Sequence, residues 1–190
     1  MQNTIARRFD EAAAVLGASG AHLSERMVQA AKLLIACLRA DGAVYLFGNG
    51  GSAADAQHFA GELVGSFLKR NRRPLRAAAL TCDPSVISAV ANDFGFETVF
   101  ARQLQALGRK GDLAIGLSTS GNSPNVLAAL QAARTMGIKT IAMTGRGGGK
   151  CAALADVLLD VPCDQTPRIQ EVHAVLGHIL CELAESALTG

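Results

Sequence analysis

Apolar residues recur along this chain with two alternating spacings, which predict strands and helices in turn. Five short apolar runs have the composition of buried strands, and segments with a helical apolar period follow them. We predict strands at 43–47, 77–80, 113–117, 140–143 and 157–161, and helices near 53–66, 84–91, 97–107, 123–136 and 150–155. This order is typical of a doubly wound sheet, so we predict an α/β fold with five parallel strands.

Further helices are predicted before the first strand and after the last. Residues 5–16 keep a helical period up to Gly17, and Ser24 is a suitable cap for a second helix that ends at residues 41–42. A sheet of this size does not need two further helices to cover it, so we expect them to pack on a partner subunit. A long helix is predicted at 167–188, and the absence of a repeat or linker predicts a single domain across all 190 residues.

Composition narrows the class of protein. The chain is 49% hydrophobic and 18% charged, which suits one globular core. Its net charge of +2 gives no reason to expect a nucleic-acid partner. The one basic cluster, residues 69–73, is expected to be a solvated loop.

Neither a signal segment nor a membrane span is predicted, since no apolar stretch has the required length. The cysteines are odd in number and scattered through apolar runs, which predicts reduced core residues and a cytoplasmic protein. They are Cys37, Cys82, Cys151, Cys163 and Cys181.

Two turns at predicted strand ends favour a phosphorylated ligand. The first, residues 48–52, is glycine-rich and precedes a helix, so its backbone N–H groups and the helix N-terminus suit an anion. The second, residues 118–124, carries four hydroxyl groups and ends in Pro124 at the expected start of a helix, where Ser123 is a candidate cap. Both turns are expected at the carboxyl edge of the sheet, where ligands bind in open α/β folds. A third glycine-dense turn, residues 145–149, is placed to approach the same ligand.

Titratable side chains recur on two of the predicted helices. His58 and Glu62 are four residues apart, which places them on one helix face. Gln170 and His178 are eight apart on the last helix and project from one broad side, two turns from each other. His173 is offset from them and is expected to be structural. A carboxylate and an imidazole near a bound phosphate suit proton transfer in a small phosphate ester.

Four segments together resemble the sedoheptulose 7-phosphate isomerases (phosphoheptose isomerases) of the sugar-isomerase (SIS) domain family. They are GNGGSAADAQHFAGEL at 48–63, ANDFGFE at 91–97, STSGNSPN at 118–125 and RIQEVHAVLGHIL at 168–180. The resemblance covers nearly the whole chain in the family's order. It implies the SIS fold, a cytoplasmic homotetramer with sites between subunits, and aldose–ketose isomerisation of a phosphorylated seven-carbon sugar. The product would be D-glycero-D-manno-heptose 7-phosphate, the first intermediate toward nucleotide-activated heptose for lipopolysaccharide or capsule.

The resemblance also implies roles for individual residues. Glu62 and His178 correspond to the family's acid–base pair, and some members bind zinc through a set that matches His58, Glu62, Gln170 and His178. If zinc is bound, Glu62 either holds the metal while another group moves the proton or exchanges between the two roles. The substrate-binding residues that it implies are Asn49, Gly50, Gly51, Ser52, Asp93, Ser118, Thr119, Ser120, Ser123 and Gln170. On local grounds Asp93 is equally suited to a capping role.

Two positions depart from the family pattern. Many members have arginine where this chain has Ser66, and some have aspartate near the position of Thr166-Pro167. Both differences lie near the expected rim of the site, so they affect substrate contacts more than reaction class. The alternatives are an isomerase for another phosphosugar and a non-catalytic SIS protein that regulates replication initiation. The presence of both Glu62 and His178 argues against the second, and no DNA-binding segment is predicted.

Overall fold

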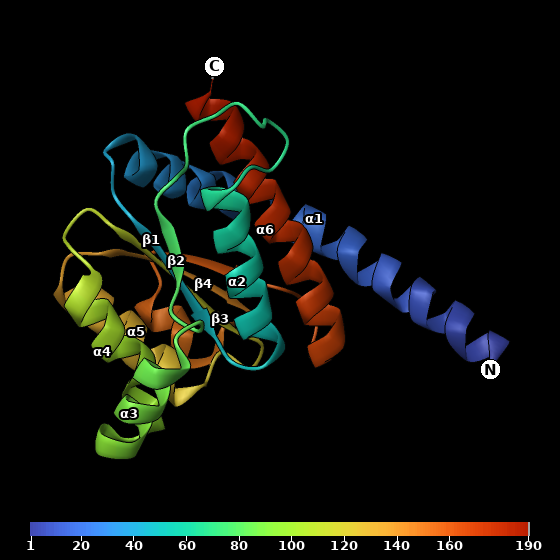
Figure 1. The fold of residues 1–190 in the computed structure, drawn as a ribbon. Helices are drawn as coiled ribbons and strands as arrows, with labels where there is room; N and C mark the ends of the chain where they lie inside the picture. Colours follow the sequence, from blue (N-terminus) through green and yellow to red (C-terminus); the bar gives the residue numbers. More distant parts are fainter. Residues whose placement is uncertain (190) are drawn as a thin grey trace.

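Five apolar segments pair in parallel to form the predicted sheet, and the computed structural model describes it within residues 1–189 (Figure 1). The strands are β1 (Val44–Gly48), β2 (Ala77–Ala79), β3 (Leu113–Ser118), β4 (Lys139–Thr144) and β5 (Val157–Asp160), in the spatial order β2-β1-β3-β4-β5. The predicted strands are confirmed, with ends that differ by at most one residue. The sheet belongs to the α/β class because helices cover both of its faces.

Successive side chains of β1 point to opposite faces of the sheet and belong to two separate hydrophobic cores. Leu46 packs under the helices α1 (Gln2–Arg39), α2 (Gly51–Val64) and α6 (Thr166–Leu188). Its neighbours Tyr45 and Phe47 point to the opposite face, where the cover is α4 (Val99–Leu107), α5 (Pro124–Thr135) and the 3₁₀ helix η2 (Gly149–Leu154). The two-residue period of a strand produces this division. The remaining helices are α3 (Pro84–Phe94) and the short 3₁₀ helix η1 (Phe96–Thr98).

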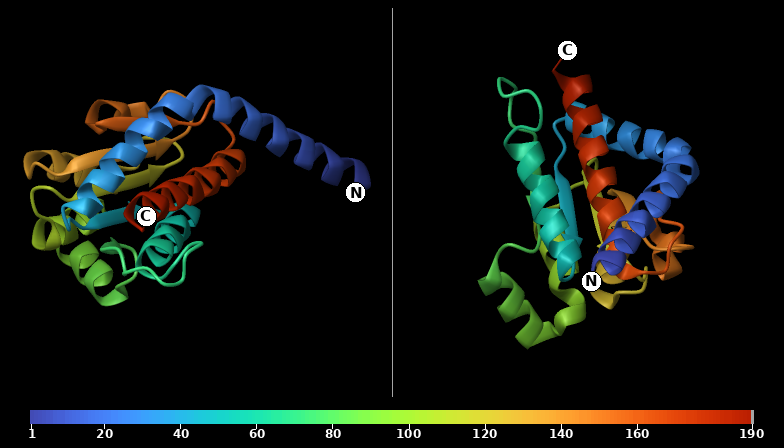
Figure 2. Two further views of the ribbon diagram at one scale, coloured as in Figure 1. Left: turned by 90° about the horizontal axis from the view of Figure 1, so that it is seen from above. Right: turned by 90° about the vertical axis from the view of Figure 1, so that its right-hand side faces the viewer.

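The chain begins with one helix of 38 residues, so the prediction of two N-terminal helices was wrong. An isolated glycine weakens a helix by about 1 kcal/mol but does not end it, and Gly17 and Ser24 both lie inside α1. The first half of α1 extends away from the rest of the molecule (Figure 2). Its apolar side chains Ile5 and Phe9 are 57% and 73% exposed.

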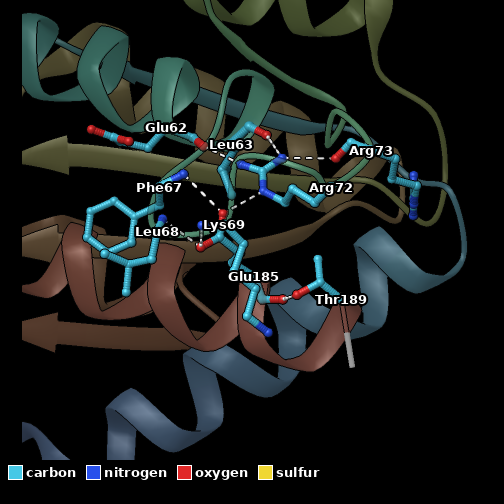
Figure 3. Close-up of polar contacts among 9 residues, drawn as sticks. All are labelled: Glu62, Leu63, Phe67, Leu68, Lys69, Arg72, Arg73, Glu185 and Thr189. Carbon is cyan, nitrogen blue, oxygen red and sulfur yellow. Dashed lines mark hydrogen bonds and ion pairs between the residues drawn. The ribbon is translucent and has the colours of Figure 1, made fainter.

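Two further predictions need correction. Cys82 is exposed in the turn after β2, whereas the other four cysteines are buried and reduced as expected. Within the basic cluster 69–73, Arg72 is not solvated: its side chain is 1% exposed and pairs with Glu185 at 2.7 Å (Figure 3). Its partner is 113 residues further along the chain, beyond the reach of local pattern analysis. No helix among residues 1–189 has both the length and the apolar character needed to cross a bilayer.

Candidate active site

The loops after β1 and β3 lie at the point where the order of the strands reverses. These two strands are neighbours in the sheet, but the chain continues from β1 to one side and from β3 to the other. The side-chain amides of Asn49 and Asn125 join the two loops by reciprocal hydrogen bonds of 2.9 and 2.8 Å. Ligands of doubly wound folds bind in the crevice at such a point. The prediction that both loops share the carboxyl edge is therefore confirmed.

The first loop has the backbone that an anion site needs. Gly50 takes a positive φ of 54° immediately before α2, and no side chain caps the first turn of this helix. A Cβ at Gly48 would lie 2.8 Å from the carbonyl oxygen of Leu117 and from the Cβ of buried Ser52. The chain consequently turns tightly at the end of β1, and the N-terminus of α2 that follows it favours negative charge.

The second loop gathers its hydroxyl groups around one buried serine. Ser118 Oγ is 2.9 Å from Ser123 Oγ and 3.5 Å from Ser120 Oγ. Pro124 opens α5 as predicted, and Ser123 occupies the cap position. Its hydroxyl bonds to Ser118 rather than to the helix amides, however, so the capping bond is not formed. Thr119, half-buried between Ser118 and Ser120, completes the predicted hydroxyl set.

The third glycine-dense turn, 145–149, braces the second loop from behind. Gly145 N–H donates to the carbonyl of Thr119 at 3.0 Å, and Cys151 N–H donates to that of Gly121 at 3.0 Å. Gly121 has a φ of 64°, and a Cβ there would lie 2.1 Å from the carbonyl oxygen of Gly148. The turn therefore fixes the shape of the hydroxyl loop.

Helices α2 and α6 lie side by side and point in the same direction, which brings three titratable side chains together (Figures 1 and 2). His58 Nε2 is 2.8 Å from His178 Nε2 and 3.7 Å from Glu62 Oε1. Ligand atoms of all three lie within 4.8 Å of one another. Where α6 contacts α2, Gly177 packs so closely on Phe59 that a Cβ at Gly177 would be 2.0 Å from the ring.

Gln170 lies beside the first loop, at the other end of this helix pair. A Cβ at Gly51 would be 2.3 Å from Gln170 Nε2, so the amide of Gln170 rests on the start of α2. Eight residues of helix, about 12 Å, separate it from His178. Within one chain Gln170 therefore adjoins the first loop. The other three residues of the predicted metal set, His58, Glu62 and His178, come together without it.

Two other predicted residues lie apart from this cluster. Asp93 is exposed near the end of α3, where its carboxylate accepts a hydrogen bond of 2.7 Å from Asn92. His173 is fully buried as expected, and its Nε2–H donates to the carbonyl of Thr144 at 3.2 Å. Burial lowers the pKa of His173 to about 4 despite that hydrogen bond, so it is neutral at neutral pH. It supports the end of β4 rather than the cluster.

Three residues near the site were not predicted. Asn125 ties the two loops together, and its place after Pro124 at a helix start was an available signal. The ring of Phe67 stacks on that of His178, with centroids 5.6 Å apart and planes at 22°. Asp55 lies one turn before His58; burial raises its pKa, and His58 opposes the shift. No periodicity or motif singles out Phe67 or Asp55.

Comparison with known proteins agrees with this fold. The family described as SIS domain matches residues 9–145. A phosphoheptose isomerase of Aquifex aeolicus is 51% identical over 185 residues, which cover 97% of this chain and 96% of that protein. The solved phosphoheptose isomerase of Neisseria gonorrhoeae superposes with a TM-score of 0.91 at 47% identity, over 97% of this chain and 98% of that chain. That of Francisella tularensis gives 0.91 at 35% identity, with 98% of both chains covered. This chain belongs to the phosphoheptose isomerases of the SIS domain family.

Proposed function

We propose that this protein isomerises sedoheptulose 7-phosphate to D-glycero-D-manno-heptose 7-phosphate. The observation that carries the proposal is the cluster of His58, Glu62 and His178, about two helical turns along α2 from a loop built for an anion. Family membership supports the reaction class, an aldose–ketose isomerisation of a phosphosugar. The product would enter the synthesis of nucleotide-activated heptose for a surface glycan.

The chemistry follows from what each group can hold or move. The hydroxyls of Ser118, Ser120 and Ser123, with the amides at the start of α2, bind the phosphate. Glu62 takes a proton from C1 and returns it to C2, which converts the ketose to the aldose through an enediol. His178 moves the hydroxyl proton from O1 to O2, so atoms and charge balance.

The same cluster fits a divalent metal. Two imidazoles and a carboxylate are a common donor set for catalytic zinc. The ligand atoms of His58, Glu62 and His178 lie within 4.8 Å of one another, so these three residues would hold one ion. When bound, zinc would polarise the two sugar oxygens. Glu62 then either helps to hold the metal or moves the proton, and Gln170 of this chain stays at the phosphate end.

We also propose a cytoplasmic homotetramer with sites between subunits. The apolar side chains on the projecting half of α1 support this assembly, since Ile5 and Phe9 are largely exposed. Between α1 and the start of α6 lies a hollow of about 430 Å³ lined by Phe9, Ala12 and Leu16. A second copy would bury this surface and bring further residues to the site. Sedimentation at micromolar concentration tests the assembly, and a monomer would contradict it.

The test of activity is direct incubation with sedoheptulose 7-phosphate in deuterated water, followed by NMR. We expect the C1 proton of an aldose to appear, and deuterium to enter at C2 because the proton held by Glu62 exchanges with solvent before it is delivered. Pentose and hexose phosphates serve as parallel substrates. Turnover of a pentose or hexose phosphate alone would show that the protein is an isomerase for that sugar. A protein that turns over none of these sugars would favour the alternative of a non-catalytic SIS protein.

A further inference from the structure

A buried ion pair closes the end of the α2–α6 packing, behind the side chains proposed to do the chemistry. Arg72 Nε lies 2.7 Å from Glu185 Oε1, and the two side chains are 1% and 2% exposed (Figure 3). Glu185 also accepts the backbone N–H groups of Phe67, Leu68 and Lys69 at 3.0, 2.7 and 2.9 Å. Burial raises the pKa of Glu185, but Arg72 and the amides outweigh this and lower it to about 2. The carboxylate is therefore charged and fully partnered at neutral pH.

Arg72 also holds the last turn of α2, which carries Glu62. Its Nη2 donates to the carbonyl oxygen of Glu62 at 2.6 Å, and its Nη1 donates to that of Leu63 at 2.9 Å. The last carbonyls of a helix have no partner within the helix, and a cation there also complements the helix dipole. The guanidinium thus fixes the backbone of the residue proposed to move the carbon-bound proton.

Glu185 reaches His178 through Phe67. The carboxylate holds the N–H of Phe67, and the ring of Phe67 stacks on the imidazole of His178. Glu185 lies seven residues after His178 on α6, two turns along the same helix face. One ion pair therefore supports both members of the proposed acid–base pair, each from behind and neither by contact with its reactive atoms.

We infer that Arg72 and Glu185 are positioning residues, which set the orientation of Glu62 and His178 for proton transfer. This inference rests on the proposed function. A buried ion pair adds little net stability compared with apolar packing, because its desolvation offsets its attraction, so stability alone is a weak reason for its presence. What the pair supplies is a fixed geometry between a loop and two helices.

The kinetic test compares Glu185→Gln and Arg72→Lys with a matched control. Glutamine keeps the shape of Glu185 without its charge, and lysine keeps the charge of Arg72 but cannot fork to two carbonyls. The control, Asp112→Asn, removes another buried carboxylate that accepts two backbone N–H groups, those of Ala43 and Arg109. We expect kcat to fall roughly 10–100-fold in both variants, as for small misplacements of catalytic groups. KM should stay within about twofold, because neither residue touches the phosphate loops.

A spectroscopic test does not depend on turnover. Because the ring of Phe67 stacks on the imidazole of His178, we expect it to shift the imidazole proton resonances upfield, and histidine-labelled protein would report this shift directly. We expect the upfield shift to be lost in Glu185→Gln and Arg72→Lys and kept in Asp112→Asn. If one of the two variants fails to fold, kcat and the His178 resonances of the other variant test the proposal.

The outcomes separate the two proposals. Wild-type protein that leaves sedoheptulose 7-phosphate unchanged overturns the proposed function, before any variant is compared. An active wild type with unchanged kcat and unchanged His178 resonances in the variants overturns the positioning role alone. An equal loss of kcat in Asp112→Asn also overturns it, because the effect would then follow from general destabilisation.

Discussion

Asn49 and Asn125 each donate a side-chain amide hydrogen bond to the other, at 2.9 and 2.8 Å, across the switch point of the sheet. The pair holds the glycine loop after β1 against the hydroxyl loop after β3. Asn125 is buried and its oxygen also accepts the N–H of Val126 at 2.9 Å. Asn49 was predicted to face the sugar, and this stays a prediction: the two bonds to Asn125 leave one N–H and one lone pair of its amide for that contact.

Replacing Asn125 with alanine should loosen the phosphate site. Asn49 would lose its partner in a half-buried position, which costs about 1–3 kcal/mol of unfolding free energy. KM for the sugar phosphate should rise because the two loops are no longer held in register. Denaturant melts and steady-state kinetics measure both effects, with Asn92→Ala on the exposed surface of α3 as the control. Unchanged KM and stability would contradict a tie between the loops.

Removing the hydroxyl of Ser120 or Ser123 should mainly weaken substrate binding. Each would lose one hydrogen bond to a charged phosphate, worth roughly 1.5–3 kcal/mol. Steady-state kinetics of Ser120→Ala and Ser123→Ala should therefore show a raised KM. Ser88→Ala on α3 controls for the loss of an exposed hydroxyl. If KM stayed normal in both variants, the phosphate would have to bind elsewhere.

Glu62→Gln and His178→Ala should each abolish turnover without unfolding the protein. Glutamine cannot take a proton from carbon near neutral pH, and alanine removes the second proton carrier. General acid–base groups contribute about 10²–10⁴-fold, so kcat should fall at least that much. The double variant should lose little more, because both groups serve one proton path. The measurement is kcat beside a thermal melt, with Glu182→Gln on the exposed face of α6 as control. Normal turnover in either variant would sink the mechanism.

Zinc content should depend on His58. Elemental analysis of purified protein should find metal in the wild type and a strong reduction in His58→Ala, because one of three clustered donors is gone. His22→Ala removes an exposed imidazole near Asp160 and should leave the metal content unchanged. Equal zinc in wild type and His58→Ala would place the metal outside the cluster.

The neutral, buried His173 predicts a loss of stability in mild acid. Its pKa is lowered from 6.5 to about 4 in the folded protein, so the unfolded chain binds the extra proton between these values. Above pH 6.5 His173 is neutral in both states and does not reduce the free energy of unfolding. As the pH drops from 6.5 toward 4, this free energy falls by roughly 3 kcal/mol in total. Denaturant melts from pH 7 to 4 should show a shallower pH dependence in His173→Gln, which keeps a donor but does not titrate. Parallel curves for the two proteins would refute the assignment.

The sequence predicted those features that are encoded locally. Apolar period located the strands, and glycine, hydroxyl and proline positions located both loops, because turn chemistry is set by a few adjacent residues. The four-residue spacing of His58 and Glu62 placed them on one face of α2, as observed. Their approach to His178 was implied by the family resemblance, since periodicity gives no pairing between distant helices.

Features that depend on tertiary packing were not predictable from local pattern. The 38 residues of α1 run through a glycine that looked like a stop, because packing of its second half outweighs a weak local preference. Arg72 looked like one of several solvated cations until Glu185, 113 residues away, was placed beside it. Gln170 carried the correct helical spacing from His178, but only the packing of α6 on α2 shows that it adjoins Gly51.

Gly177 sets the distance between helices α2 and α6, because it has no side chain and packs directly on the ring of Phe59. A single added methyl at 177 would meet the ring at 2.0 Å and force α6 away from α2. His178 would move with α6 and His58 would stay with α2, so the gap between the two imidazoles depends on the volume of the residue next to one of them. Alanine and serine at this position would widen the gap in small steps. The spacing of the two imidazoles is thus adjustable at a residue that carries no functional group.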